Sequence, residues 1–262
     1  IEKFGGPEVL KIKDVEISKP GPKEVLIKNQ SIGLNFIDVY HRTGLYPIPL
    51  PSGIGLEACG LIEEVGSEVR LFKVGDRVTH ASMPIGAYSE KQIMPEDKLI
   101  SVPNGISDEV ASCITLKGIT AEYLLHRAYP LKKGDKVLYH AAAGALGQIL
   151  CPWANSIGAE IIGTVGSKEK EEIAKKNGCH HVINYADKNF VEEVEKIVGK
   201  NGIDVVYDGV GLKTFEGSIE VLKIRGMMVA FGNASGYVDT IDVKKHINAK
   251  GLFFTRPSIA HY

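Results

Sequence analysis

The chain has 262 residues, of which 44% are hydrophobic and 24% charged, so it can bury a core in one large domain or two ordinary ones. Its 31 basic and 32 acidic side chains nearly cancel, which argues against nucleic acid or an anionic membrane surface as a partner. No apolar run has transmembrane length and no secretory leader pattern is visible, so the expected compartment is the cytoplasm. The four cysteines stand far apart, as expected of buried apolar side chains in a reducing compartment.

Up to about Pro103 the sequence consists of short alternating runs divided by glycine and proline. This pattern is typical of a compact β-rich domain, with strands expected at residues 24–28, 60–66 and 76–79. The proline-rich residues 47–51 suit neither a strand nor a helix, and we expect a loop there.

Beyond about Lys117 the pattern changes to strands that alternate with helices. Apolar strands are expected at 137–140, 160–165, 181–184, 204–207 and 227–231, and helices at 147–157, 168–177, 189–198 and 214–223. Such alternation implies a parallel sheet with right-handed crossovers.

A turn of small residues connects the first of these strands to the first helix. Ala141, Gly144 and Gly147 have the spacing of the dinucleotide-binding fingerprint, with alanine in place of its first glycine. Small residues allow backbone amides to approach a pyrophosphate, and the positive end of the helix dipole favours the same anion. The alternative is a turn that is merely tightly packed, but the position between a strand and a helix favours a dinucleotide site.

The end of the second strand indicates which dinucleotide binds. An NAD-preferring site places an acidic residue there, whereas this chain has Gly166 and Ser167 with lysines nearby, including Lys170. A hydroxyl and an ammonium group suit the 2′-phosphate of NADP(H), which is the predicted cofactor. Ser167 could equally cap the helix with the lysines solvated, and Glu169 would oppose a phosphate.

No motif for a protein nucleophile or a metal is present. His180 and His181 would point to opposite faces of a strand, so they cannot share an ion. Hydride transfer needs no protein nucleophile, because the cofactor carries the chemistry.

Several segments together resemble one known family, in order and in spacing. They are residues 35–40, 42–46, 53–60, 75–78, 86–89, 116–121, 140–147, 183–185, 206–208, 231–233 and 255–258. Over essentially its whole length the chain resembles the quinone oxidoreductases, the zinc-free, zeta-crystallin-like branch of the medium-chain dehydrogenase/reductase superfamily. The resemblance is to the bacterial NADPH:quinone reductase type above all.

The resemblance implies an α/β fold with two domains. A GroES-like β-rich catalytic domain would cover residues 1–117, and a Rossmann domain with a doubly wound parallel sheet would bind NADP(H) through residues 118–258. Residues 259–262 would begin the return to the first domain. Family members continue further, so we expect the C-terminal part of the site's wall to be absent from this chain.

The resemblance also implies that the site holds no metal. Zinc-dependent members have a cysteine ligand where this chain has Asn35 and a histidine ligand where it has Leu56. Glu57 remains, but a single carboxylate cannot hold a catalytic zinc.

Residue roles follow from the same resemblance. Tyr46 and Asn35 would belong to the catalytic end, with Tyr46 polarising the substrate carbonyl. The cofactor would contact Phe36, Asp38, Tyr40, Thr120, Tyr123, Gly144, Ala145, Leu146, Gly147, Gly166, Ser167, Lys170, Tyr185, Val210, Phe231, Gly232, Phe254 and Thr255. For Phe36 and Tyr40 the alternative is a plain role as core aromatics.

These observations predict an NADPH-dependent quinone oxidoreductase that works as a homodimer and reduces a small-molecule quinone without metal. One alternative is an NADPH-dependent enone or alkenal reductase, which the linear sequence does not separate from the first. Another is a non-catalytic NADPH-binding protein with a structural or RNA-binding role, against which the balanced charge argues.

Overall fold

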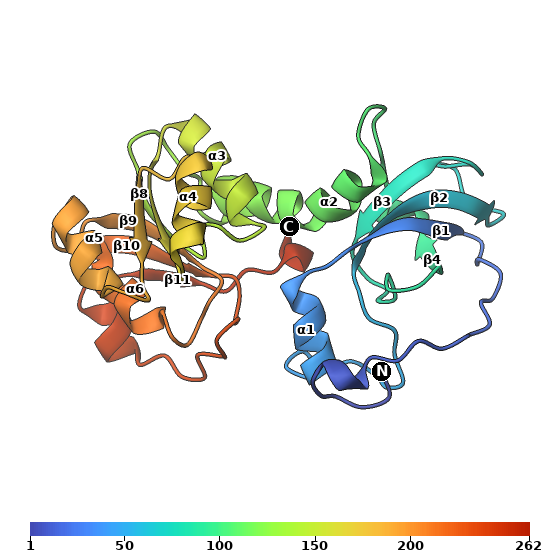
Figure 1. The fold of residues 1–262 in the computed structure, drawn as a ribbon, viewed down its shortest axis with the longest axis horizontal. Coiled ribbons are helices and arrows are strands. Elements are labelled where there is room, and N and C mark those ends of the chain that lie inside the picture. The colour runs from blue at the N-terminus through green and yellow to red at the C-terminus, as the bar shows by residue number, and fades with distance from the viewer. The chain divides into compact units, whose positions relative to one another are not determined.

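The computed structural model describes residues 1–262, and the chain folds into two compact units, Ile1–Leu116 and Lys117–Tyr262 (Figure 1). The division falls within helix α2 (Asp108–Tyr123), which continues into the π-helical turn η3 (Leu124–Ala128). The first unit contains an antiparallel sheet and the second a parallel one, so the predicted fold class is confirmed.

The sheet of the first unit has the strand order β4-β1-β2-β3-β5. Inward-facing residues of its strands, among them Val25, Ile27 and Ile62, form the buried core. The other elements are helix α1 and two short 3₁₀ turns, and the loop expected at 47–51 is confirmed. The bounds are β1 (Glu24–Gly33), β2 (Glu57–Val65), β3 (Arg77–Ala81), β4 (Lys91–Pro95), β5 (Ile100–Ser101), α1 (Phe36–Thr43), η1 (Pro7–Val9) and η2 (Glu96–Lys98).

Strand β1 is twice as long as predicted, and β2 begins three residues before the predicted start. Two irregularities in the pairing of β1 with β2, at Leu26/Ile27 and Asn29/Ser31, shift the register and interrupt the polar–apolar alternation. In the second half of β1 the less exposed positions carry the polar Asn29 and Ser31, so the apolar–polar period of a strand is missing from the sequence there. Gly60 allows the two strands to approach, because a Cβ there would lie 2.2 Å from the carbonyl oxygen of Lys28.

The second unit contains a six-stranded parallel sheet in the order β11-β10-β9-β6-β7-β8. The order reverses at β6, which has β7 on one side and β9 on the other. The strands are β6 (Lys136–His140), β7 (Glu160–Val165), β8 (His181–Asn184), β9 (Ile203–Asp208), β10 (Leu222–Ala230) and β11 (Phe253–Thr255). The helices are α3 (Gly147–Ile157), α4 (Lys168–Lys176), α5 (Phe190–Val198) and α6 (Phe215–Val221).

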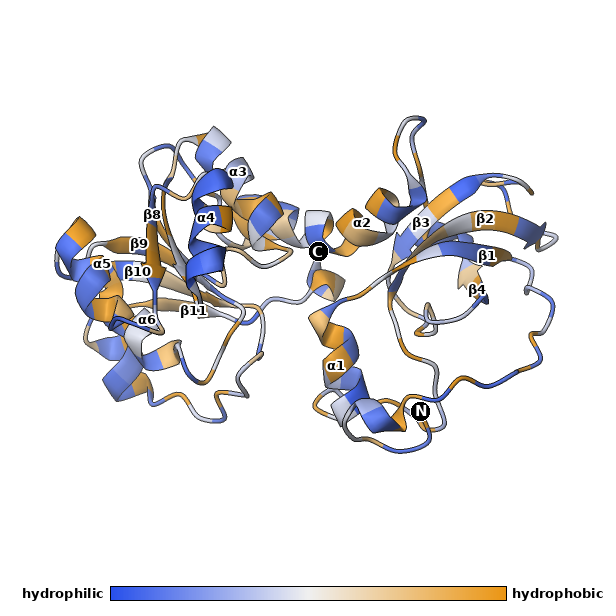
Figure 2. Cartoon of the chain, viewed as in Figure 1, coloured by the Kyte–Doolittle hydropathy of each residue, from blue (hydrophilic) through white to orange (hydrophobic).

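Helices cover both faces of this sheet. Along β6, Tyr139 packs with α3 and α4 in one hydrophobic cluster, while its neighbour Leu138 packs with α5 and α6 in another. This follows from the two-residue repeat of a strand, and strands buried on both faces are apolar throughout. Figure 2 shows that α4, which consists largely of lysine and glutamate, is mostly hydrophilic.

Most predicted elements of the second unit are confirmed within a residue or two, but one boundary was wrong. The helix predicted at 214–223 ends at Val221, and β10 begins at Leu222, five residues before the predicted strand. Leu222 pairs with Ile203, and the register then shifts between Leu222 and Met227, a stretch that contains Arg225 with a φ of 60°. Because of this irregular stretch, the sequence pattern does not indicate where the strand begins. The short β11, the π-helical turn η4 (Val243–Asn248) and the 3₁₀ turn η5 (Ile259–His261) were not predicted.

Candidate functional site

The turn between β6 and α3 has the geometry that a dinucleotide fingerprint requires. Ala141 adopts a left-handed φ of 61°, and α3 begins at Gly147. A Cβ on Gly147 would lie 2.3 Å from the carbonyl oxygen of Ala142, so only glycine allows this close approach. The backbone amides of Ala145 and Leu146 donate no hydrogen bond within the chain. These amides lie at the start of an 11-residue helix and therefore fit a pyrophosphate group.

The end of β7 brings together the groups predicted to hold a 2′-phosphate. Gly166 and the half-buried Ser167 follow the strand, and Ser167 precedes α4, which carries the exposed Lys170. The hydroxyl of Tyr185, which follows β8, lies against Gly166, where a Cβ would approach it to 2.7 Å. The Tyr185 hydroxyl beside Gly166, Ser167 next in the chain and Lys170 in the first turn of α4 are donor-bearing residues that suit a phosphate.

Ser167 does not cap α4 with its side chain, although its extended backbone is that of an N-cap residue. Its hydroxyl instead lies beside the carboxylate of Glu169 and lowers the pKa of that group. The capping alternative is therefore not supported for the side chain. Glu169 stays ionised near the predicted phosphate position, so the opposing charge noted in the sequence remains.

The carboxyl ends of β9 and β10 gather three more predicted residues, Val210, Phe231 and Gly232. The ring of Phe231 packs on Gly209, where a Cβ would lie 2.9 Å from it, and a Cβ on Gly232 would lie 2.5 Å from the carbonyl oxygen of Gly209. The two strand ends are thus in direct contact. Phe231 also stacks on Tyr139 at 6.3 Å between ring centroids.

Strand β11 places Phe254 beside Met228 and Thr255 beside Val229. The ring of Phe254 lies edge-on to Phe215 in the core, so this side chain belongs to the packing between sheet and helices. On α2, Thr120 is half-buried, while Tyr123 is buried and stacks on Tyr262 at 4.8 Å.

In the first unit the predicted residues surround helix α1. The exposed Phe36, the buried Tyr40 and the half-buried Tyr46 form a row of aromatic rings, with centroids 5.3 Å apart for the first pair and 5.0 Å for the second. The backbone amide of Tyr46 donates to the carbonyl of Tyr40 at 3.1 Å, which fixes the chain where it leaves the helix. Tyr40 is therefore packed between its two neighbours, and it supports Tyr46 directly.

A buried polar network anchors the start of α1. The side-chain amide of Asn35 donates to Glu57 Oε2 at 2.8 Å, and Glu57 Oε1 accepts the backbone amide of Leu116 at 2.7 Å. The carboxylate of Asp38 accepts the backbone amide of Asn35 at 2.9 Å and the hydroxyl of Tyr88 at 3.0 Å. Burial, followed by the charge of Asp38, raises the pKa of Tyr88, which therefore stays protonated as a donor.

Of the three residues that the resemblance places at zinc-ligand positions, Asn35 and Glu57 are in contact, and Leu56 precedes Glu57 in the chain. Leu56 is buried, Glu57 is fully buried, and the Asn35 amide occupies one of the two carboxylate oxygens of Glu57. No three side chains of histidine, cysteine, aspartate or glutamate are grouped so that they could hold a metal ion.

Sequence patterns singled out three further polar residues, Tyr88, His140 and Asp208, only as parts of motifs. Tyr88 holds Asp38, and His140 and Asp208 are buried at the ends of β6 and β9. A polar residue at the end of an apolar strand was the signal that could have singled out His140 and Asp208.

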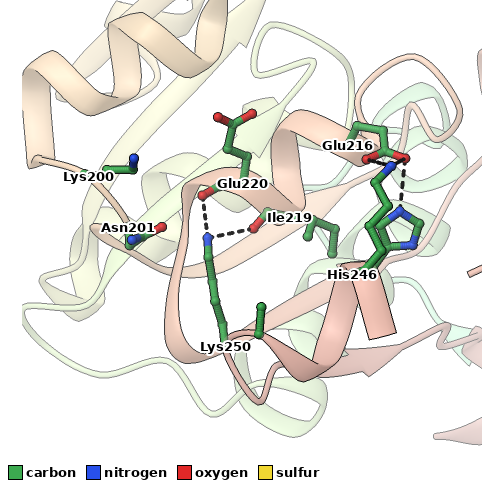
Figure 3. A pocket seen from close by; sticks show the side chains of 9 residues that line it. Lys200, Asn201, Glu216, Ile219, Glu220, His246 and Lys250 are labelled. Atoms are coloured by element: carbon green, nitrogen blue, oxygen red, sulfur yellow. Dashed lines mark hydrogen bonds and ion pairs between the residues drawn. The ribbon is translucent and has the colours of Figure 1, made fainter. Parts of the chain in front are cut away.

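A surface pocket of about 360 Å³ lies beside α6 and η4 (Figure 3). Several of its charged groups are paired within the chain: Glu216 bonds to Lys245 and His246, and the ammonium of Lys250 donates to carbonyls at the end of α6. None of the predicted site residues lines it. It is therefore not part of the candidate site.

Comparison with known proteins matches both units. Residues 21–129 match the family model described as alcohol dehydrogenase GroES-like domain, and residues 145–261 match the one described as zinc-binding dehydrogenase. None of the helices combines the length and apolar composition needed to cross a membrane.

Three relatives illustrate the similarity. A quinone oxidoreductase of Pseudomonas aeruginosa is 46% identical over 260 residues, which cover 99% of this chain and 80% of that protein. A 2-haloacrylate reductase of a Burkholderia species is 47% identical over a region that covers 100% of this chain and 81% of that protein. The crystal structure of Escherichia coli quinone oxidoreductase complexed with NADPH superposes with a TM-score of 0.97 at 45% identity, covering 100% of this chain and 80% of that one.

Proposed function

The chain belongs to the quinone oxidoreductase family of the medium-chain dehydrogenases/reductases, and from this premise we propose that it is an NADPH-dependent quinone reductase. The observation that carries the proposal is the pair of features at the carboxyl edge of the parallel sheet. One is the turn with the open amides of Ala145 and Leu146, and the other is the acid-free end of β7 with Ser167 beside Tyr185.

The bound cofactor supplies the reducing hydride through its nicotinamide ring. The chain's own residues bind and orient it: the amides of Ala145 and Leu146 hold the pyrophosphate, and Ser167, Lys170 and Tyr185 hold the 2′-phosphate. Val210, Phe231 and Gly232, which lie together at the ends of β9 and β10, line the nicotinamide half. Thr120, Tyr123 and Thr255 complete the proposed lining, and Phe254 supports it from the core.

The first unit receives the quinone. The exposed Phe36 and the half-buried Tyr46, which pack on either side of the buried Tyr40, offer flat apolar faces to a flat substrate, and the Tyr46 hydroxyl donates a hydrogen bond that polarises the substrate carbonyl. Asn35 and Asp38 hold α1 in place through Glu57 and Tyr88. The reduced oxygen takes its proton from water, so no buried acid is needed.

The test is oxidation of NADPH, followed by its absorbance, with phenanthrenequinone as the acceptor. We expect turnover with NADPH and at least about tenfold lower kcat/KM with NADH, because NADH lacks the charge that Ser167 and Lys170 bind. Failure of every quinone tried to oxidise NADPH would remove the proposal.

One observation favours a second candidate function. The similarity to a 2-haloacrylate reductase is as high as that to the quinone oxidoreductases, and haloacrylates have an activated double bond. Reduction of such an alkene would use the same cofactor site and a different fit at the aromatic row. Parallel assays with 2-chloroacrylate, a short alkenal and a quinone decide between the two.

We further propose that the protein is a cytoplasmic homodimer. Four free cysteines suit a reducing compartment. Strand β11 lies at the edge of the parallel sheet, and its Phe253 is 49% exposed. In the proposed dimer a second copy of the chain covers this edge. Sedimentation of the protein and fractionation of its host cells test the two statements. Salt-sensitive retention of RNA on a filter would instead support the RNA-binding alternative.

A further inference from the structure

A buried histidine and a buried aspartate lie where the order of the parallel sheet reverses. Strands β6 and β9 are neighbours there, and Tyr139 pairs with Tyr207. The next residues, His140 and Asp208, therefore end the two strands side by side, with 1% and 0% of their surface exposed. Ligands of such sheets bind outside the carboxyl ends of the strands at this reversal.

A chain of hydrogen bonds links the two side chains beneath that edge. His140 Nδ1 lies 2.9 Å from the hydroxyl oxygen of Thr164 on β7, and Nε2 lies 2.9 Å from that of Ser218 on α6. The Ser218 hydroxyl in turn lies 3.4 Å from Asp208 Oδ2. Three strands and one helix are thus connected through a single imidazole.

The direction of the chain follows from its acidic end. The carboxylate of Asp208 can only accept, so the Ser218 hydroxyl donates to it and accepts from Nε2–H of His140. Nδ1 then accepts the hydroxyl of Thr164. Burial lowers the pKa of His140, in keeping with the neutral ring that this arrangement requires.

Asp208 also organises the turn that follows β9. Its Oδ1 accepts the backbone amides of Val210 at 2.7 Å and Gly211 at 2.9 Å, and its Oδ2 accepts the hydroxyl of Thr214 at 2.7 Å. This turn contains Gly209, on which Phe231 packs. Asp208 therefore fixes the residues that the proposed function places along the nicotinamide half.

The histidine end of the chain leads into the phosphate-binding turn. Ala141, directly after His140, has a φ of 61°, which an alanine adopts only where its surroundings enforce it. The backbone amide of Ala142 donates to the carbonyl of Thr164 at 3.0 Å, and the Thr164 side chain contacts His140. One set of contacts thus holds both the start of this turn and, through Ser218, the turn after β9.

We propose that His140 is a positioning residue which, through Ser218 and Asp208, holds the turn at 209–211 in place relative to the phosphate-binding turn at 141–147. The proposal rests on the NADPH-dependent function argued above. Its consequence is specific, because the link governs where the nicotinamide half lies relative to the pyrophosphate. The adenosine half, bound at the ends of β7 and β8, should not depend on it.

Two conservative variants each keep one of the two hydrogen bonds of the imidazole. In His140→Gln the side-chain amide reaches the position of Nε2 and can donate to Ser218. In His140→Asn the amide reaches only the position of Nδ1 and keeps the contact to Thr164. Ser218→Ala removes the middle of the chain with the smallest change in volume, and it serves if a His140 variant does not fold.

The measurement compares the affinities of each full-length variant for NADPH and for 2′-phospho-AMP, which lacks the nicotinamide half. We expect His140→Asn and Ser218→Ala to bind NADPH about tenfold more weakly and 2′-phospho-AMP within about twofold of wild type, since a lost buried hydrogen bond has this effect. His140→Gln should restore NADPH binding. The control is Thr79→Val, which removes a buried hydroxyl from the first unit and should leave the ratio of the two affinities unchanged.

If His140→Asn and Ser218→Ala lowered the affinities for NADPH and 2′-phospho-AMP equally, the histidine would only stabilise the fold, and the proposal would be overturned. Identical NADPH affinities of the Asn and Gln variants would overturn it as well. A wild-type chain that binds neither ligand refutes the proposed function itself, and this result is read from wild type alone.

Discussion

His80 on strand β3 should make the stability of the protein depend on pH. Its side chain is 1% exposed, and neither ring nitrogen makes a hydrogen bond of good geometry. Burial lowers the pKa of His80 from 6.5 to about 4, and the backbone of Leu56 opposes this shift only in part. The neutral ring is thus favoured in the folded chain, whereas the unfolded chain takes up a proton below pH 6.5.

The sign and the size follow from these two values. Because the unfolded state binds more protons, stability falls as the pH falls from 6.5 towards 4 and is fully present above that range. The loss between pH 8 and pH 5 amounts to about 2 kcal/mol, with an upper limit of about 3.4 kcal/mol well below pH 4. His41 and His140 are also buried, and burial lowers the pKa of each, so the effect of His80 has to be measured as a difference from wild type.

The perturbation is His80→Leu, with unfolding in urea followed by circular dichroism at pH 8 and at pH 5. We expect the variant to lose about 2 kcal/mol less than wild type between the two pH values. The control His126→Leu, at an exposed position, should keep the wild-type pH dependence. If the His80 variant loses as much stability as wild type, or if the His80 ring protons titrate near pH 6 in a nuclear magnetic resonance experiment, the argument from burial is wrong.

Three further changes probe the site directly. Gly147→Ala places a methyl group 2.3 Å from the Ala142 carbonyl oxygen, so we expect NADPH binding, measured by its fluorescence, to weaken at least about tenfold. Ser167→Asp puts a carboxylate at the end of β7 and should shift the ratio of kcat/KM for NADPH over NADH by about a hundredfold towards NADH, whereas an unchanged ratio would place the 2′-phosphate elsewhere. Tyr46→Phe removes the proposed hydrogen bond and should lower kcat/KM for quinones about tenfold without changing the Kd of NADPH, and an unaffected kcat/KM would exclude that role.

Much of the fold was readable from local pattern. The turn from residue 141 to Gly147 combines small residues with a preceding apolar strand and a following helix, and the strands and helices around it repeat with their own periods. The end of β7 was equally local, since Gly166 and Ser167 occupy the position where an acid would select NAD. These features lie within a few residues of one another, so sequence spacing determines their geometry.

The partners of the buried polar groups could not be predicted in this way. Asn35 meets a glutamate 22 residues away, His140 meets a serine 78 residues away, and the start of β10 depends on pairing with β9 across an irregular stretch. Over such separations the spacing in sequence does not predict the distance in space, because the order of the strands decides which side chains meet. Local patterns were thus enough to predict the alternating elements, the dinucleotide turn and the character of the strand ends. The buried chain of His140, Ser218 and Asp208 emerges only in the folded molecule, because a polar side chain excluded from water finds its partner wherever the packing supplies one.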